Sequence, residues 1–160
     1  TKFISMSTFL RSSASAKGSI LASTSFLNGE ITEPAQGYSQ KALYDLEHQY
    51  IEIEGLKIFG SPHAIRHGTT AFGYERQHGD YVWADLKKVD ILITHGPPLG
   101  IMDIGKEEKK HLGCESLLKK VLEIKPQFHI FGHIHEPGGN RVVKNGITFA
   151  NFLSAEADEL

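Results

Sequence analysis

FHIFGHIHE, residues 128–136, is a largely apolar run that ends in the pattern Gly-His-x-His. A short run of this kind is typical of a strand that is buried on both faces. His133 and His135 lie two residues apart, so an extended backbone would project both imidazoles to the same side. Gly132 would let the backbone approach a ligand closely. The stretch therefore predicts a strand that carries a metal-binding pair at its end.

A second stretch, DILITHGPPLG at residues 90–100, has the same design. A β-branched run ends in Thr94 and His95, and a Gly/Pro loop follows. In open α/β sheets the carboxyl ends of the strands form the edge where ligands bind. One histidine alone is more often a hydrogen-bonded core or loop imidazole, but His95, His133 and His135 together favour a ligand role.

Composition limits the class of protein. A chain of 160 residues, 40% hydrophobic and 22% charged, is typical of one globular domain. The net charge of -2 gives no electrostatic footprint for nucleic acid or an anionic membrane, and no apolar run approaches the length of a membrane span. Cys114 is the single cysteine, which excludes a disulfide within the chain.

The ends of the chain differ from its middle. Residues 1–39 form a basic, Ser-rich N-terminal arm and linker, in which the first 29 residues hold eight serines and no acidic residue. This composition is similar to an organellar transit peptide, and it also fits a flexible tail or an arm that docks on a partner. Residues 40–154 form the folded half-domain, and residues 155–160 form an acidic tail.

Local patterns predict the elements of the half-domain. Residues 50–53 and 56–59 read as a hairpin, residues 63–81 as a long loop, and residues 85–88 as the end of a short helix. The apolar spacing of residues 114–124 predicts an amphipathic helix, which Pro126 ends. A strand at 127–132 completes a right-handed strand-helix-strand unit. Residues 141–150 read as a hairpin with Asn145-Gly146 as its type I′ turn.

These motifs resemble the C-terminal half of the calcineurin-like metallophosphoesterases, and most closely their MPPED-type branch. The matching residues are THGPP at 94–98, GHIHE at 132–136, Asn145-Gly146 before a strand that ends at Asn151, GSP at 60–62 and AFG at 71–73. The resemblance covers residues 40–154. It implies an α/β fold in which two β-sheets are sandwiched between helices. It also implies that the protein hydrolyses phosphate esters with two metal ions.

The resemblance also implies a ligand set. His95 and His133 would bind one metal and His135 the other, with Mn, Fe, Zn or Ni as the divalent transition metal. The family's Asp-x-His and Gly-Asn-His motifs are missing from this sequence, and Gly79-Asp80 reads as a turn. We therefore expect a partial metallophosphoesterase-like β-sandwich flanked by helices, without its N-terminal half and inactive as an isolated chain.

A sandwich cut in half leaves a sheet edge and an apolar face uncovered, so we expect an obligate protein partner or a larger assembly. Two hypotheses follow. The chain is half of a phosphate-ester hydrolase that another chain completes, or it is a non-catalytic structural subunit of a larger complex. We expect a mitochondrial or cytoplasmic location. The other histidines are unassigned, with His67 and His78 expected nearest to a substrate: His63, His67, His78, His111 and His129.

Overall fold

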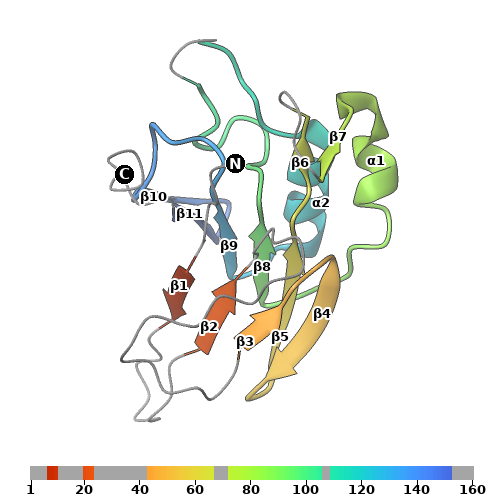
Figure 1. Ribbon diagram of the computed structural model, residues 1–160, viewed down its shortest axis with the longest axis vertical. Coiled ribbons are helices and arrows are strands. Elements are labelled where there is room, and N and C mark those ends of the chain that lie inside the picture. The colour runs from red at the N-terminus through yellow and green to blue at the C-terminus, as the bar shows by residue number, and fades with distance from the viewer. Residues whose placement is uncertain (1–6, 11–19, 24–42, 67–71, 106–108, 153–160) are drawn as a thin grey trace.

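The computed structural model describes residues 7–10, 20–23, 43–66, 72–105 and 109–152 (Figure 1). Most of the predicted arm and all of the acidic tail lie outside these ranges. Among the described residues, no helix is long and apolar enough to cross a membrane.

A six-stranded mixed sheet forms the centre of the fold, with the strand order β10-β11-β9-β8-β5-β4. The four inner strands β11, β9, β8 and β5 are parallel to one another, and each edge strand is antiparallel to its neighbour. The bounds are β4 Gln49–Ile53, β5 Leu56–Ser61, β8 Ile91–Thr94, β9 Phe128–Phe131, β10 Arg141–Lys144 and β11 Ile147–Asn151. The α/β class that the sequence predicted is confirmed.

Helix α2, Glu115–Ile124, connects β8 to β9, so the predicted strand-helix-strand unit is confirmed. The helix begins where the Cys114 sulfur accepts a hydrogen bond from the backbone N–H of Leu117. It ends at Lys125, whose backbone is left-handed with φ 47°. The apolar stripe of the helix buries Leu117, Val121 and Ile124, as its spacing predicted.

Both predicted hairpins are present. β4 pairs with β5 around Glu54-Gly55, and β10 pairs with β11 around Asn145-Gly146. All four turn residues have positive φ, at 50° and 80° in the first turn and 54° and 78° in the second. Positive φ at both central positions is the signature of a type I′ turn, which matches the right-handed twist of the strands it joins.

The predicted long loop at 63–81 is wrong. Strand β6, Ala64–Ile65, pairs in parallel with β7, Gly73–Tyr74, and a 3-10 helix η1 at Arg76–His78 leads into helix α1 at Gly79–Val82. These elements are too short to leave a periodic pattern in the sequence.

Gly79-Asp80 is therefore the start of α1 and not a turn. A Cβ at Gly79 would lie 2.8 Å from the Ser116 Oγ and 3.2 Å from the Cys114 Sγ. Glycine is needed at this position because α1 packs closely against the start of α2. The predicted helix end at 85–88 is also wrong, since α1 ends at Val82 and Trp83 closes it with a backbone hydrogen bond to the Gly79 carbonyl.

Two apolar clusters lie on the sheet. The larger one joins α2 to strand residues such as Phe59, Leu92 and Phe131, and it includes the buried Trp83. The smaller one consists of Leu46, Ile58, Ile91, Ile93 and Ile130. Because neighbouring residues of a strand point to opposite faces, the alternation of Ile91, Leu92 and Ile93 between the two clusters places them on opposite faces of the sheet.

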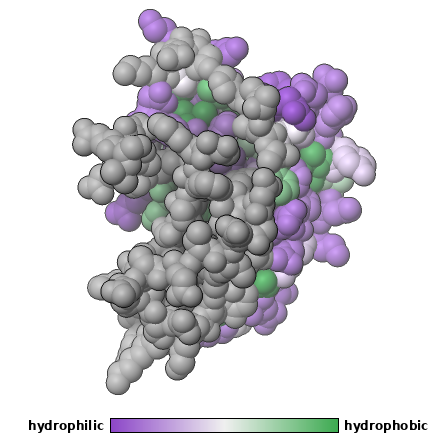
Figure 2. Space-filling model, viewed as in Figure 1, coloured by the Kyte–Doolittle hydropathy of each residue, from purple (hydrophilic) through white to green (hydrophobic). Residues whose placement is uncertain are grey.

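A second sheet has the order β1-β2-β3, from Ser7–Leu10, Ile20–Ser23 and Leu43–Asp45. Two of these strands fall inside the segment predicted as an arm. The side chains of this second sheet lie outside the described part of the chain. The two-sheet sandwich with helices on both outer faces therefore stays a prediction. In Figure 2 the described surface over α1 and β4 is mainly hydrophilic, with isolated hydrophobic residues.

Candidate functional site

His95 lies directly after β8, at the carboxyl edge of the parallel strands. Its backbone N–H donates to the Ser61 carbonyl at 3.0 Å, and its carbonyl accepts a hydrogen bond from the Gly132 N–H at 3.1 Å. The first bond ties the residue to the end of β5 and the second ties it to the segment after β9. The backbone of His95 is therefore fixed from both sides.

His95 and His133 meet, as the sequence predicted. The His133 Nδ1 lies 3.1 Å from the His95 Nε2, and the ring centroids are 4.8 Å apart. One of these nitrogens must carry the proton and the other must accept it, which requires at least one neutral imidazole. Two ring nitrogens that face each other at this distance also form a pair of donor atoms on which a transition metal could be held.

Burial keeps His95 neutral. Desolvation, followed by the charges of His133 and His135, lowers the pKa of His95 from 6.5 to about 4. At neutral pH this imidazole is in the unprotonated form, which is the form that binds a metal.

His135, the third predicted ligand, does not form a metal-binding group with His95 and His133. Within the described ranges, no group of three or more His, Cys, Asp or Glu residues could hold a metal ion. His135 is exposed and influences the pKa of His95 through its charge, and Glu136 is exposed as well. A two-imidazole pair therefore fits part of a metal site and lacks the carboxylates of a complete one.

The prediction that His133 and His135 project to the same side assumed an extended backbone, and the segment does not have one. Strand β9 ends at Phe131, and His133 has a left-handed backbone with φ 69°. The Ile134 N–H donates to the Gly132 carbonyl at 2.8 Å, which bends the chain at this point. The spacing rule for strands thus does not apply after Gly132.

Asn151, at the end of β11, holds this bent segment. It is buried, and its Nδ2 donates to the Ile134 carbonyl at 2.8 Å. We expect Asn151→Ala to lower the free energy of unfolding by about 1 to 3 kcal/mol, because the Ile134 carbonyl loses its partner in a buried place. Urea unfolding would measure this, with Asn140→Ala as a control on an exposed asparagine. Equal losses in the two variants would contradict the assignment.

Sequence reasoning missed a second polar cluster next to the pair. The buried Ser61 hydroxyl lies 3.0 Å from the His48 Nδ1 and 2.9 Å from the His63 Nδ1. The His63 carbonyl accepts a hydrogen bond from the Gly96 N–H at 3.4 Å, so the cluster adjoins the His95 segment. A serine that ends a buried apolar strand was the one signal in the sequence that could have indicated it.

The remaining histidines play different parts. His129 is fully buried, with its Nε2 2.9 Å from the Thr94 Oγ1, and is a core residue. His111 is half-exposed, with its Nδ1 2.7 Å from an oxygen of the buried Asp103. His78, expected near a substrate, is exposed on η1, and His67 lies outside the described residues.

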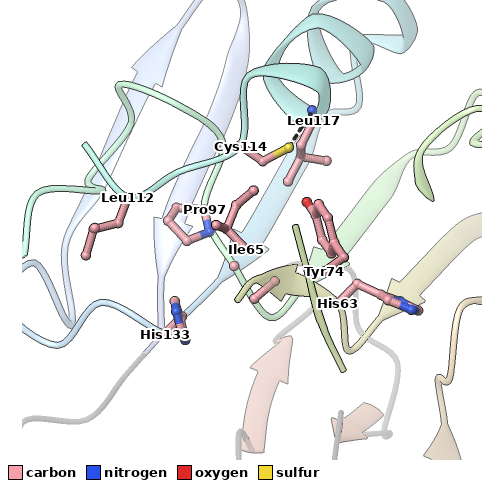
Figure 3. Close-up of a pocket in the computed structure, with 10 residues that line it drawn as sticks. His63, Ile65, Tyr74, Pro97, Leu112, Cys114, Leu117 and His133 are labelled. Carbon is pink, nitrogen blue, oxygen red and sulfur yellow. Dashed lines mark hydrogen bonds between the residues drawn. The ribbon is translucent and has the colours of Figure 1, made fainter. Parts of the chain in front are cut away.

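A narrow pocket lies between the two polar clusters (Figure 3). Its lining includes His63, Tyr74, Pro97, Cys114 and His133, and it has no space for a water-sized sphere. In Figure 3 the His63 ring points away from His133, toward the opposite side of the pocket.

The fold and the site define an α/β protein with paired imidazoles at the carboxyl edge of a parallel sheet. No protein-family model matches the chain. Human metallophosphoesterase domain-containing protein 1 is 35% identical over 131 residues, which are 79% of this chain and 39% of that protein. A UPF0046 protein of Caenorhabditis elegans is 39% identical over 66% of this chain and 36% of its own length. The chain belongs to this metallophosphoesterase family.

The match spans less than half the length of these relatives. A protein of Emericella nidulans named as a rhamnogalacturonate lyase C is 43% identical over 91 residues, but the match covers only 8% of that protein. One solved structure is similar at 21% identity and a TM-score of 0.49, over 68% of this chain and 45% of its own.

Proposed function

We propose that this chain supplies the histidine half of a metal-dependent site that hydrolyses phosphate esters. The observation that carries the proposal is the pair of facing ring nitrogens, the His95 Nε2 and the His133 Nδ1, 3.1 Å apart at the carboxyl edge of the sheet. Membership of the metallophosphoesterase family supports the same class of reaction.

The donor set suits a divalent transition metal such as Mn, Fe, Zn or Ni, because neutral imidazoles are good ligands for these ions. His95 and His133 would hold the ion, and His135 would bind either the same ion or a second one. Such a metal polarises a phosphate oxygen and lowers the pKa of a bound water. The chain's own contribution is to fix the His95 backbone between Ser61 and Gly132.

The carboxylates that would complete the site are not gathered around the pair in the described part of the chain. We therefore propose that the chain alone is not a catalyst, and that an obligate partner chain supplies the remaining ligands. The second candidate is a non-catalytic structural subunit of a larger complex, for example in the mitochondrion. The incomplete donor set favours this reading, since a site that never binds metal needs no carboxylates.

Zinc and manganese titrations of the purified chain distinguish half of a metal site from a purely structural subunit. We expect weak binding of one ion by the native chain and a loss of at least about tenfold in affinity in His95→Ala, because one of two neutral ligands is removed. His78→Ala, which removes an exposed imidazole on η1, is the control. Equal affinities in native protein and His95→Ala would overturn the ligand assignment.

Native mass spectrometry of the endogenous particle then tests whether a partner chain completes the metal site. Two metals per particle, together with a partner that brings carboxylates, would support a shared hydrolase site and justify a screen of phosphate esters. A metal-free chain among unrelated subunits would support the structural role and end the search for a substrate.

A further inference from the structure

The cluster of His48, Ser61 and His63 lies outside the proposed metal site and is built differently. Both Nδ1 atoms face one hydroxyl, and that hydroxyl is fully buried. The two imidazoles are half-buried, with ring centroids 5.0 Å apart. The His48 ring also packs edge-on against Phe59 and lies 5.9 Å from the ring of Trp83.

The donors and acceptors of this cluster limit the number of protons that its two imidazoles can carry. A serine hydroxyl donates one hydrogen and accepts others. With two neutral imidazoles or with one protonated, the hydroxyl can donate to one Nδ1 and accept from the other. With both protonated, both Nδ1 atoms become donors, the hydroxyl hydrogen loses its acceptor in the cluster, and two positive charges lie side by side. The second proton therefore breaks the cluster.

The cluster also fixes the chain before β4. His48 has a left-handed backbone with φ 55°, an unusual conformation for a residue that is not glycine. Two residues earlier, Leu46 is 1% exposed and packs on the apolar cluster of Ile58, Ile91, Ile93 and Ile130. Residues 46–48 thus wrap around the edge of β5, with Leu46 on one face of the sheet and His48 beside Trp83.

We propose that His48, Ser61 and His63 form an acid-operated latch. Double protonation releases residues 46–48 from the sheet edge, which uncovers Trp83 on one face and the apolar cluster beneath Leu46 on the other. This inference is independent of the proposed phosphohydrolase function.

The charges around His48 fix the direction of the response. Burial lowers the pKa of His48, and the nearby Asp85 carboxylate partly opposes this shift. Burial and the charge of His48 lower the pKa of His63. The other rings against His48, Phe59 and Trp83, are uncharged. The latch is therefore closed at neutral pH and opens as the pH falls below 6.5.

Trp83 is the only tryptophan of the chain, so its fluorescence reports on the latch. We expect acrylamide quenching of Trp83 to rise about threefold between pH 7.5 and pH 5.0, with increased binding of an apolar dye and an unchanged far-UV circular dichroism spectrum, as for a local opening. The buried His95 and His129, with pKa values of about 4 and about 3, are still neutral at pH 5.0.

His48→Asn is the decisive variant. Asparagine tolerates a left-handed backbone and can hydrogen-bond to Ser61, but it does not titrate. We expect its Trp83 quenching to be the same at both pH values, while the control His78→Asn responds like the native chain. The proposal is overturned if native quenching does not change with pH, or if His48→Asn and the native chain respond alike.

Discussion

Lowering the pH from 7.5 to 5.0 should remove about 4 kcal/mol from the free energy of unfolding, through His129 and His95 alone. Burial lowers the pKa of His129 from 6.5 to about 3, and burial with two neighbouring imidazoles lowers that of His95 to about 4. The unfolded chain takes up these protons near pH 6.5 and the folded chain does not. The stability they contribute is complete above pH 6.5 and is lost as the pH falls toward the folded values, at about 2 kcal/mol per histidine by pH 5.0.

The hydrogen bonds of His129 explain why its protonation in the folded chain costs free energy. The Thr94 hydroxyl donates to the Gly96 carbonyl at 2.7 Å, so its oxygen accepts from the His129 Nε2. This leaves the His129 Nδ1 as a buried atom without a hydrogen-bond partner. A proton on that nitrogen would create a buried N–H with no acceptor, which is costly.

Chemical denaturation at several pH values measures the effect. His129→Gln cannot titrate at this position and should lose about 2 kcal/mol less than the native chain over the same pH range. A native chain whose unfolding free energy is constant from pH 7.5 to 5.0 would show that these imidazoles are not buried as described.

Gly60→Ala should destabilise the protein by about 3 kcal/mol, the upper part of the usual range for an overpacked core. Gly60 lies in β5, and a Cβ there would lie 2.6 Å from the Leu46 Cδ1 and 2.9 Å from the Leu46 Cγ. These contacts are too close for carbon atoms, and the Leu46 Cβ is nearer still. Either residues 46–48 must move off the sheet edge or β5 must shift against β8.

Two further variants test whether the clash with Leu46 causes this loss of stability. Gly55→Ala places its Cβ in open space and strains only the turn backbone at φ 80°, so it should cost about 1 kcal/mol. Leu46→Gly removes the obstructing side chain, so in that background Gly60→Ala should have a much smaller effect. Strictly additive losses in the double variant would exclude the steric explanation.

The strands and the helix around the site could be predicted from the sequence because their signals are local. The β-branched run at Ile91–Thr94, the apolar spacing of Glu115–Ile124 and the Asn145-Gly146 turn each specify their own backbone. The meeting of His95 with His133 followed from these elements, since parallel neighbours bring their carboxyl ends to one edge.

Short elements left no such signal. Ala64–Ile65 and Gly73–Tyr74 pair with each other, and Gly79–Val82 is a single helical turn, so the tertiary packing and not the local pattern decides their structure. The buried position of Gly79 against Ser116 could not be inferred from a stretch of mainly polar residues.

Local sequence patterns thus specify the parallel core, its connecting helix, and the two imidazoles that face each other at its edge. The bend after Gly132, which sets the backbone of His133 and His135, is not visible in the local pattern, because it depends on contacts such as the Asn151 hydrogen bond to Ile134 from another strand. The tertiary structure also brings His48 to Ser61 and His63. His63 is two residues from Ser61 in the chain, but His48 comes from the segment before β4 and reaches the hydroxyl only in the folded β4–β5 hairpin. The Glu54-Gly55 turn fixes the register of the hairpin, but the position of the His48 ring depends on its packing against Phe59 and Trp83, which are distant in the sequence.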